Sequence, residues 1–295
     1  MSDQKLLDEL IQTLNLEKLE ENLFRGQSEQ TAWGRVFGGQ VIGQALSATQ
    51  ETVDNSRKAH SLHAYFLRPG RIDMPILYDV QRIRDGKIFI EDNLLTLQRA
   101  EKDFGVPKEV ITAILGVETD YGRVMGKYRV IDSLTTLGFD DPRRSEFFRS
   151  ELIQFFILTR ENNLDILKTK GSYAGAMGYG QFISSSYRAY AIDFDGDGYV
   201  DLFNSIEDSI GSVANYLKVH GWVRNGKIVT KSSLNNVRDI YKPHVSLSKF
   251  IPLSFNENGE DIYFIGDDNF VAITKYNRSH FYAMAVYYLS EELKK

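Results

Sequence analysis

An acidic residue closes the apolar stripe of one helix-forming segment in the middle of the chain. The segment runs from Val106 to Glu118, and its apolar residues recur at helical spacing. These residues are Val110, Ile111, Ile114 and Leu115. Pro107 favours the first turn of a helix and Gly122 favours a helix end, so both ends are marked. The sequence therefore predicts a helix with Glu118 at the inner edge of its last turn.

A carboxyl group at this position loses water, and loss of water disfavours its charged form. We therefore expect the pKa of Glu118 to rise into the range where a carboxylic acid donates a proton near neutral pH. Two structural alternatives remain for such a residue. It could pair with an arginine in the core, or it could turn past the helix end into solvent.

Further along the chain, four stretches match the sequence pattern of one enzyme family. These stretches are Thr119 to Gly126, Lys170 to Phe182, Tyr190 to Trp222 and Ile273 to Met284. Together with the Glu118 helix they resemble the membrane-bound lytic transglycosylase B family, from about Asn93 to the C-terminus. The resemblance implies a lysozyme-like core that cleaves bacterial peptidoglycan.

The predicted reaction uses a single carboxyl group, that of Glu118. Asp120 is the nearest candidate partner for Glu118, but two residues along a helix correspond to a rotation of about 200°, so the two side chains point apart. The resemblance implies a non-hydrolytic cleavage of the MurNAc–GlcNAc β-1,4 bond. In it Glu118 protonates the glycosidic oxygen and then accepts the proton of the muramoyl 6-hydroxyl, which closes a 1,6-anhydro ring.

The glycine-rich run from Gly171 to Gly180 lacks the lysine and hydroxyl ending of a phosphate loop. It predicts a tight loop whose backbone can approach a sugar. At positions that match the family, polar and aromatic side chains are expected to bind the glycan, although each tyrosine alone could equally be core packing. These residues are Ser172, Tyr179, Gln181, Tyr216, Tyr276, Asn277 and Tyr282.

The stretch from Asp193 to Asp201 matches the start of an EF-hand calcium loop. Acidic residues occupy its first, third, fifth and ninth positions, and glycine occupies the sixth. The predicted ligands are Asp193, Asp195, Asp197, Asp201 and the backbone carbonyl of Tyr199. The twelfth position is Asn204, and the resemblance implies a longer loop closed by Glu207 or Asp208. The bound Ca²⁺ would be structural; a solvated acidic turn is the alternative.

The N-terminal part follows another pattern. It contains a predicted amphipathic helix over Leu6 to Leu19, a helix entered through Gly38 and Gly39, the motif His60 to Gly70, and a strand over Pro75 to Ile83 that ends at the turn Arg84–Asp85–Gly86. These features are similar to the N-terminal part of type II acyl-CoA thioesterases, which have a double hot-dog fold. The resemblance stops near Gly86, before the half that carries that family's catalytic residues.

The predicted fold class is α+β. Residues 1–87 are expected to form a truncated hot-dog-like segment, and residues 88–295 a lysozyme-like transglycosylase domain with an EF-hand-like loop. A small β-rich subdomain is predicted over 223–271, with strands in Lys227–Lys231 and Asp261–Ile265, before a final helix over His280–Leu293. Because no linker separates the two patterns, we hypothesise a deletion between two genes or an assembly error.

Composition limits the remaining possibilities. The net charge of −5 and the lack of a basic aromatic run argue against nucleic-acid binding. The N-terminus has no continuous apolar run, so neither a signal peptide nor a transmembrane segment is expected. As written, the chain would stay in the cytoplasm, although the family acts in the periplasm or at the outer membrane. Two alternatives stay open: an inactive or glycan-binding-only chimera, and an acyl-CoA thioesterase-related protein.

Overall fold

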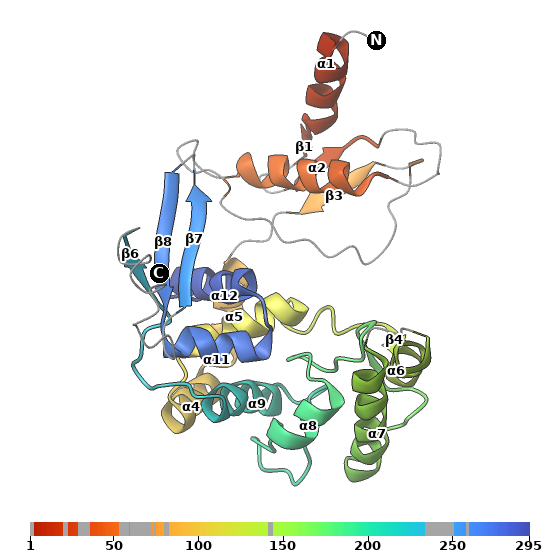
Figure 1. Ribbon diagram of the computed structural model, residues 1–295, viewed down its shortest axis with the longest axis vertical. Coiled ribbons are helices and arrows are strands. Elements are labelled where there is room, and N and C mark those ends of the chain that lie inside the picture. The colour runs from red at the N-terminus through yellow and green to blue at the C-terminus, as the bar shows by residue number, and fades with distance from the viewer. Residues whose placement is uncertain are drawn as a thin grey trace, which may run out of the picture. The chain divides into compact units, whose positions relative to one another are not determined.

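The computed structural model describes residues 3–19, 23–28, 36–52, 59, 72–73, 75–79, 83–140, 144–233, 251–257 and 260–295. The chain divides into two compact units (Figure 1). The first comprises Met1–Arg82 and Ser254–Ile262, and the second comprises Ile83–Leu253 and Tyr263–Lys295. The motif from His60 to Gly70 lies outside the described residues, and so do Asn258 and Gly259.

The first unit carries a small antiparallel sheet and two helices. Its elements are α1 (Asp3–Leu14), β1 (Glu17–Lys18), β2 (Leu23–Gly26), α2 (Gly38–Gln50) and β3 (Ile76–Asp79), and the strand order is β1-β2-β3. The predicted helix over Leu6 to Leu19 is too long. Glu17 instead pairs across the sheet with Arg25, whose Nε and Nη2 donate to the two carboxylate oxygens at 2.7 Å. The chain after α1 is therefore a strand paired with β2 and not a continuation of the helix.

Helix α2 begins at Gly38, as predicted. Its buried Gln44 connects three elements through one side-chain amide. Gln44 Nε2 donates to the carbonyls of Thr13 and Gln27, and Gln44 Oε1 accepts the hydroxyl of Tyr78 on β3 at 2.7 Å. A buried amide with all its partners fixes the orientation of the helix on the sheet.

The second unit is mostly helical. Its helices are α3 (Arg84–Asp92), α4 (Leu94–Phe104), α5 (Lys108–Thr119), α6 (Val130–Phe139), α7 (Ser145–Glu161), α8 (Ser184–Tyr190), α9 (Ile206–Val219), α11 (Asp268–Tyr276) and α12 (His280–Leu293). Arg84, Asp85 and Gly86 open α3, so the prediction of a turn at these residues was wrong. Gly86 is accommodated within this helix because its missing Cβ leaves room for the ring of Tyr121.

Short strands complete the second unit. Strands β4 (Tyr128–Arg129) and β5 (Lys170–Gly171) form an antiparallel pair. Strands β6 (Val229–Ser232), β7 (Ile251–Glu257) and β8 (Glu260–Gly266) form a sheet of order β6-β8-β7, and the outer end of the β7–β8 hairpin, Ser254–Ile262, belongs to the first unit. The strands predicted near Lys227–Lys231 and Asp261–Ile265 and the final helix are confirmed.

Helix α5 lies at the centre of the second unit and packs against α3, α4, α9 and α12. The predicted stripe is buried completely: Val110, Ile111, Ile114 and Leu115 are each at most 1% exposed. Each such side chain contributes about 1.5–3 kcal/mol relative to an exposed position. The helix ends at Thr119, because Asp120 takes the left-handed C-cap conformation, and this end comes earlier than the predicted one at Gly122.

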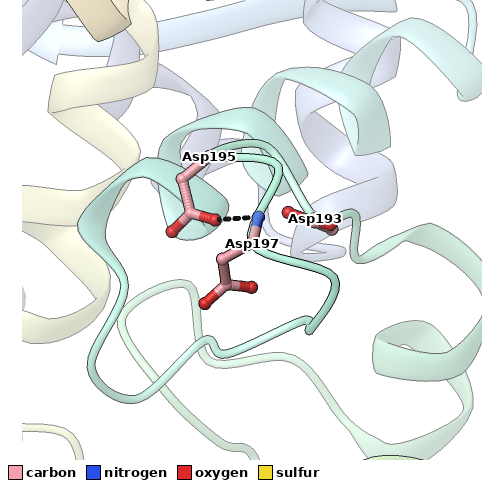
Figure 2. Close-up of side chains that lie close together, drawn as sticks. All are labelled: Asp193, Asp195 and Asp197. Atoms are coloured by element: carbon pink, nitrogen blue, oxygen red, sulfur yellow. Dashed lines mark hydrogen bonds between the residues drawn. The ribbon is translucent and has the colours of Figure 1, made fainter.

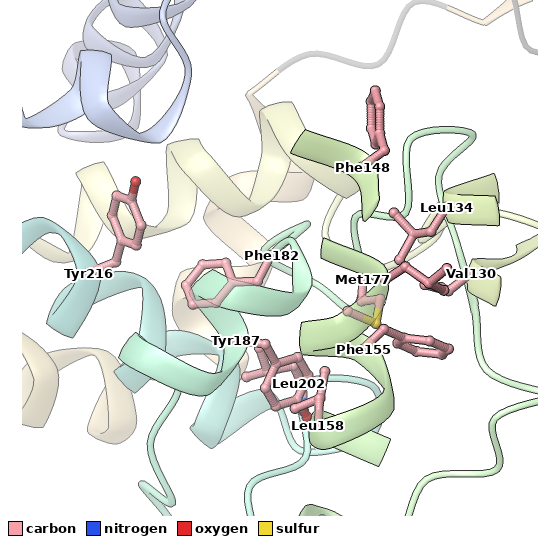
Figure 3. Packing of buried hydrophobic residues seen from close by; sticks show 11 residues of the cluster. Val130, Leu134, Phe148, Phe155, Leu158, Met177, Phe182, Tyr187, Leu202 and Tyr216 are labelled. Carbon is pink, nitrogen blue, oxygen red and sulfur yellow. The ribbon is translucent and has the colours of Figure 1, made fainter. Parts of the chain in front are cut away.

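A second apolar cluster joins α6, α7 and α8 to the glycine-rich loop (Figure 3). Its centre contains Leu134, Phe155, Leu158, Met177 and Leu202, all at most 1% exposed. Met177 belongs to the glycine-rich loop and forms a bridge with Phe182. The cluster therefore fixes this loop relative to the helices.

Candidate active site

Glu118 lies in the last turn of α5, and the residue is half-buried. Its Oε1 accepts a hydrogen bond of 2.6 Å from the hydroxyl of Tyr282. Burial raises the pKa of Glu118 from 4.5 to about 7, and the hydrogen bond from Tyr282 opposes this rise. Near pH 7 the carboxyl group is therefore present in comparable amounts as acid and as carboxylate.

Tyr282 reaches Glu118 from the first turn of α12. The hydroxyl of Ser279 caps this helix by accepting the backbone N–H of Tyr282 at 3.3 Å. Because α12 packs along α5, the cap fixes the position from which the phenol meets the carboxyl group. Residues 164 positions apart in the sequence thus meet at one hydrogen bond.

Two further tyrosines pack against each other, and one of them, Tyr276, lies near Glu118. The Tyr276 hydroxyl donates to the Gly180 carbonyl at 2.5 Å, and the Tyr216 hydroxyl donates to the Lys275 carbonyl at 2.7 Å. Their ring centroids lie 4.8 Å apart. Burial raises the pKa of the Tyr276 phenol well above its usual value, and the charge of Glu118 adds to this rise.

The glycine-rich loop adjoins the end of α5. The Thr119 hydroxyl lies 2.8 Å from the Tyr179 carbonyl and accepts the N–H of Gly122. A Cβ on Gly122 would lie 1.9 Å from the Tyr179 ring, so this glycine permits close packing of the loop. Nothing in the sequence beyond its position next to Glu118 distinguished Thr119 as a residue of the site.

The other predicted sugar-binding residues lie in the same loop and after α11. Ser172 Oγ accepts the N–H groups of Ala174 and Ala176. Gln181 has a positive φ of 51°, and its Nε2 donates to the carbonyls of Met125 and Gly178. Asn277 follows Tyr276 in the half-buried turn before α12.

The acidic loop lies between α8 and α9. Carboxylate oxygens of Asp193, Asp195 and Asp197 lie within 4.8 Å of one another (Figure 2). Backbone N–H groups hold them in place: Asp193 accepts from Gly196 at 2.6 Å and from Gly198 at 2.8 Å. Hard oxygen donors that converge in this way can hold a divalent cation.

The next acidic residues of this loop differ in their surroundings. Asp208 is 1% exposed, and its carboxylate accepts the backbone N–H groups of Phe194, Asp195 and Asp201. Glu207 is half-buried on the first turn of α9. In the described part of the chain, the side chain of Glu207 has no hydrogen bond or ion pair.

Residues 40–291 match the model of the family described as Transglycosylase SLT domain. The chain belongs to this family.

One curated relative of the chain is a lytic transglycosylase. The membrane-bound lytic murein transglycosylase B of Escherichia coli K12 is 42% identical over 228 residues, which cover 71% of this chain and 63% of that protein. The chain thus spans less than two thirds of the length of this relative.

Solved structures of lytic transglycosylases share the fold. SltB1 of Pseudomonas aeruginosa is 44% identical, with a TM-score of 0.67 over 72% of this chain and 78% of the other. Slt35 of Escherichia coli in complex with calcium is 41% identical, with a TM-score of 0.65 over 72% and 74%. SltB3 of Pseudomonas aeruginosa in complex with NAG-NAM-pentapeptide is 30% identical, with a TM-score of 0.62 over 72% and 63%. The predicted lysozyme-like transglycosylase fold, with mixed helices and strands, is confirmed.

The N-terminal segment is similar to different proteins. Acyl-CoA thioesterase 2 of Haemophilus influenzae is 48% identical over 89 residues, which are 30% of this chain and 30% of that protein. The chain therefore joins a piece similar to acyl-CoA thioesterases to a transglycosylase SLT domain. Among the described helices, none has the length and apolar character needed to cross a membrane.

Proposed function

We propose that the protein is a peptidoglycan lytic transglycosylase that cleaves the MurNAc–GlcNAc β-1,4 bond and forms a 1,6-anhydromuramoyl product. The observation that carries this proposal is the state of Glu118, whose pKa of about 7 suits both acid and base roles. Asp120, the nearest acidic residue in sequence, pairs with Arg123 at 3.1 Å. Among the described residues, no other carboxylate contributes to the raised pKa of Glu118.

In the proposed reaction, protonated Glu118 donates its proton to the glycosidic oxygen while the bond from that oxygen to C1 breaks. The resulting carboxylate then accepts the proton of the muramoyl 6-hydroxyl, whose oxygen bonds to C1. Protons balance because Glu118 ends as it began, and no water is consumed. The Tyr282 hydroxyl donates to Oε1, so it stabilises the carboxylate stage and leaves Oε2 for proton transfer.

The proposed role of each side chain in binding the glycan depends on the hydrogen bonds that this side chain already makes within the protein. The hydroxyls of Tyr216 and Tyr276 are engaged with backbone carbonyls, so we propose that these rings form an aromatic wall. Gln181 Nε2 is also engaged, which leaves Gln181 Oε1 to accept an N–H of an N-acetyl group. Ser172, Tyr179 and Asn277 would contact the glycan from the loop and the α11–α12 turn.

The test is the product formed from purified peptidoglycan. We expect the full chain to release anhydro-muropeptides, which mass spectrometry distinguishes from hydrolysed muropeptides by the missing water. Glu118→Gln should abolish release, while Glu146→Gln, an exposed residue of α7, should not alter it. Hydrolysed products, or no product from the unaltered protein, would refute the proposal. Binding without cleavage would favour the glycan-binding alternative.

We also propose a structural Ca²⁺ in the acidic loop, held by Asp193, Asp195, Asp197, Asp201 and the carbonyl of Tyr199. Glu207 is the better closing ligand, because its half-buried side chain makes no hydrogen bond or ion pair among the described residues, whereas Asp208 is 1% exposed and its carboxylate accepts three backbone N–H groups. The converging carboxylates and the calcium complex of Slt35 support this proposal. The ion would neutralise the mutual repulsion of the carboxylates and hold the loop on α9.

Thermal unfolding tests the calcium site. Calcium should raise the Tm of the chain more than magnesium does, and Asp197→Asn should remove this increase. Asp165→Asn, in another exposed loop where the carboxylate caps backbone N–H groups, is the matched control. If calcium raised the Tm of Asp197→Asn as much as that of Asp165→Asn, the calcium site in the acidic loop would be contradicted.

For the first 87 residues we propose a partial hot-dog-like segment, supported by α2, by the β1-β2-β3 sheet and by the similarity to thioesterases. Residues 88–295 would then form the catalytic domain, with 223–271 as its β-rich insertion. Hydrolysis of an acyl-CoA that persists in Glu118→Gln would instead assign a thioesterase activity to the N-terminal segment.

A further inference from the structure

The turn after α5 has an unusual backbone. Asp120 and Tyr121 both lie in the left-handed region, with φ of 51° and 57°. A side chain with a Cβ is disfavoured there, and a bulky one especially so, unless surrounding contacts hold it. Tyr121 N donates to the Leu115 carbonyl and Asp120 N to that of Gly116, so this turn ends the helix. Glu118 lies two residues before Asp120.

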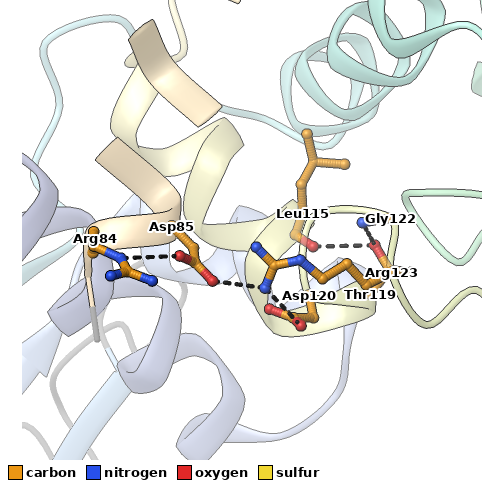
Figure 4. A network of polar contacts seen from close by, with 7 residues as sticks. All are labelled: Arg84, Asp85, Leu115, Thr119, Asp120, Gly122 and Arg123. Carbon is orange, nitrogen blue, oxygen red and sulfur yellow. Dashed lines mark hydrogen bonds and ion pairs between the residues drawn. The ribbon is translucent and has the colours of Figure 1, made fainter. Parts of the chain in front are cut away.

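Helix α3 holds this turn through an ion pair. The carboxylate of Asp85, whose side chain is 7% exposed, lies 2.6 Å from Arg123 Nη1. The same nitrogen lies 3.1 Å from the carboxylate of Asp120 (Figure 4). Arg84 adds a weaker contact with Asp85 at 3.6 Å. Arg123 therefore connects the buried acid of α3 to the first left-handed residue.

The second left-handed residue is also held by α3. The ring of Tyr121 lies against Phe89, with centroids 5.4 Å apart. A Cβ on either Gly86 or Gly116 would approach the Tyr121 side chain to between 2.6 and 2.7 Å. Glycines on both helices thus create the gap that the ring fills, and closing that gap would displace the turn.

On its other side the turn is joined to the glycine-rich loop by Thr119 and Gly122. Glu118 is therefore followed by a turn that contacts α3 on one side and the glycine-rich loop on the other. On the α3 side, the turn is held by the buried carboxylate of Asp85 and by the packing of the Tyr121 ring.

We propose that Asp85 is a positioning residue, which acts through Arg123 to hold the left-handed turn and so directs the carboxyl group of Glu118 toward Tyr282 and the scissile bond. This inference rests on the proposed transglycosylase function. A displacement of about 1 Å at a reacting group reduces the rate of the chemical step as much as about 100-fold. Substrate binding depends on other residues, so its affinity should change little.

The kinetic test uses Asp85→Asn in the full chain, with rates expressed per folded molecule. We expect kcat to fall about 10- to 100-fold and KM to stay within about twofold. Arg123→Gln should have the same effect, and the double variant should be no worse than either single one. Asp132→Asn, which breaks an exposed ion pair of the same 2.6 Å length with Arg129, is the control and should retain wild-type kcat.

A second measurement does not require activity. The ¹³C resonance of the Glu118 carboxyl, assigned by its loss in Glu118→Gln, is titrated in each variant. If Asp85 positions Glu118, its replacement weakens the Tyr282 hydrogen bond, and the pKa of Glu118 rises. A through-space effect alone has the opposite sign, because removing a negative charge lowers this pKa.

The outcomes separate the two proposals. If the unaltered chain forms no anhydro product, the proposed function fails, while the titration still decides the role of Asp85. If Asp85→Asn retains wild-type kcat per folded molecule, or leaves the Glu118 titration unchanged or lowered, the positioning role is refuted. Should Asp85→Asn not fold, the kcat of Arg123→Gln per folded molecule decides, because its half-exposed side chain can be replaced at the surface. Its titration is not used for this purpose, since removing a positive charge by itself raises the pKa of Glu118.

Discussion

Replacing Glu118 by glutamine should make the protein more stable at alkaline pH while it abolishes activity. Glutamine has nearly the shape of the protonated acid and carries no charge. Burial raises the pKa of Glu118 in the folded protein from 4.5 to about 7. Between these two values the unfolded chain has released a proton that the folded protein keeps. The stability of the wild-type protein therefore falls as pH rises through this window.

The magnitude follows from the two pKa values. Their difference, 7 minus 4.5, is about 2.5 pH units, and at 1.36 kcal/mol per unit the full effect is about 3 kcal/mol. Part of it is already present at pH 5, because the unfolded carboxyl group is largely ionised there. We therefore expect the stability of Glu118→Gln relative to wild type to increase by about 2–3 kcal/mol from pH 5 to pH 8.

Urea unfolding at pH 5 and pH 8, monitored by far-UV circular dichroism, measures this difference. Glu146→Gln is the control, because it makes the same substitution at an exposed position on α7. If the relative stability of Glu118→Gln were the same at the two pH values, Glu118 would not be a buried acid with a raised pKa. The proposed acid–base role would then lose its physical basis.

Three further predictions follow from the same region. Tyr282→Phe removes the hydrogen bond that lowers the pKa of Glu118, so the alkaline limb of the pH–rate profile should move upward by about one unit or more. Gly122→Ala forces a Cβ against the Tyr179 ring at a φ of 89°, and it should reduce both kcat and Tm; an unchanged Tm would contradict the close packing. Leu115→Ala, at a fully buried position, should destabilise the second unit by about 2–5 kcal/mol in urea unfolding, and a loss below 1 kcal/mol would place Leu115 outside the core.

Some features of this protein were readable from the sequence because they depend on local spacing. The stripe on α5, the final helix from His280 to Leu293 and the converging carboxylates from Asp193 to Asp197 all follow from residues less than one or two turns apart. The raised pKa of Glu118 was also foreseeable, because an acid on a buried face loses water wherever the face packs.

Other features required contacts between distant segments, which no local pattern encodes. Arg84, Asp85 and Gly86 read as a turn, but they begin a helix whose carboxylate pairs with Arg123. The partner of Glu118 could have been an arginine or solvent, and the packing of α12 on α5 made it Tyr282. Spacing along one helix thus determined that Glu118 faces inward, whereas its partner and direction were decided by the packing of other helices against it.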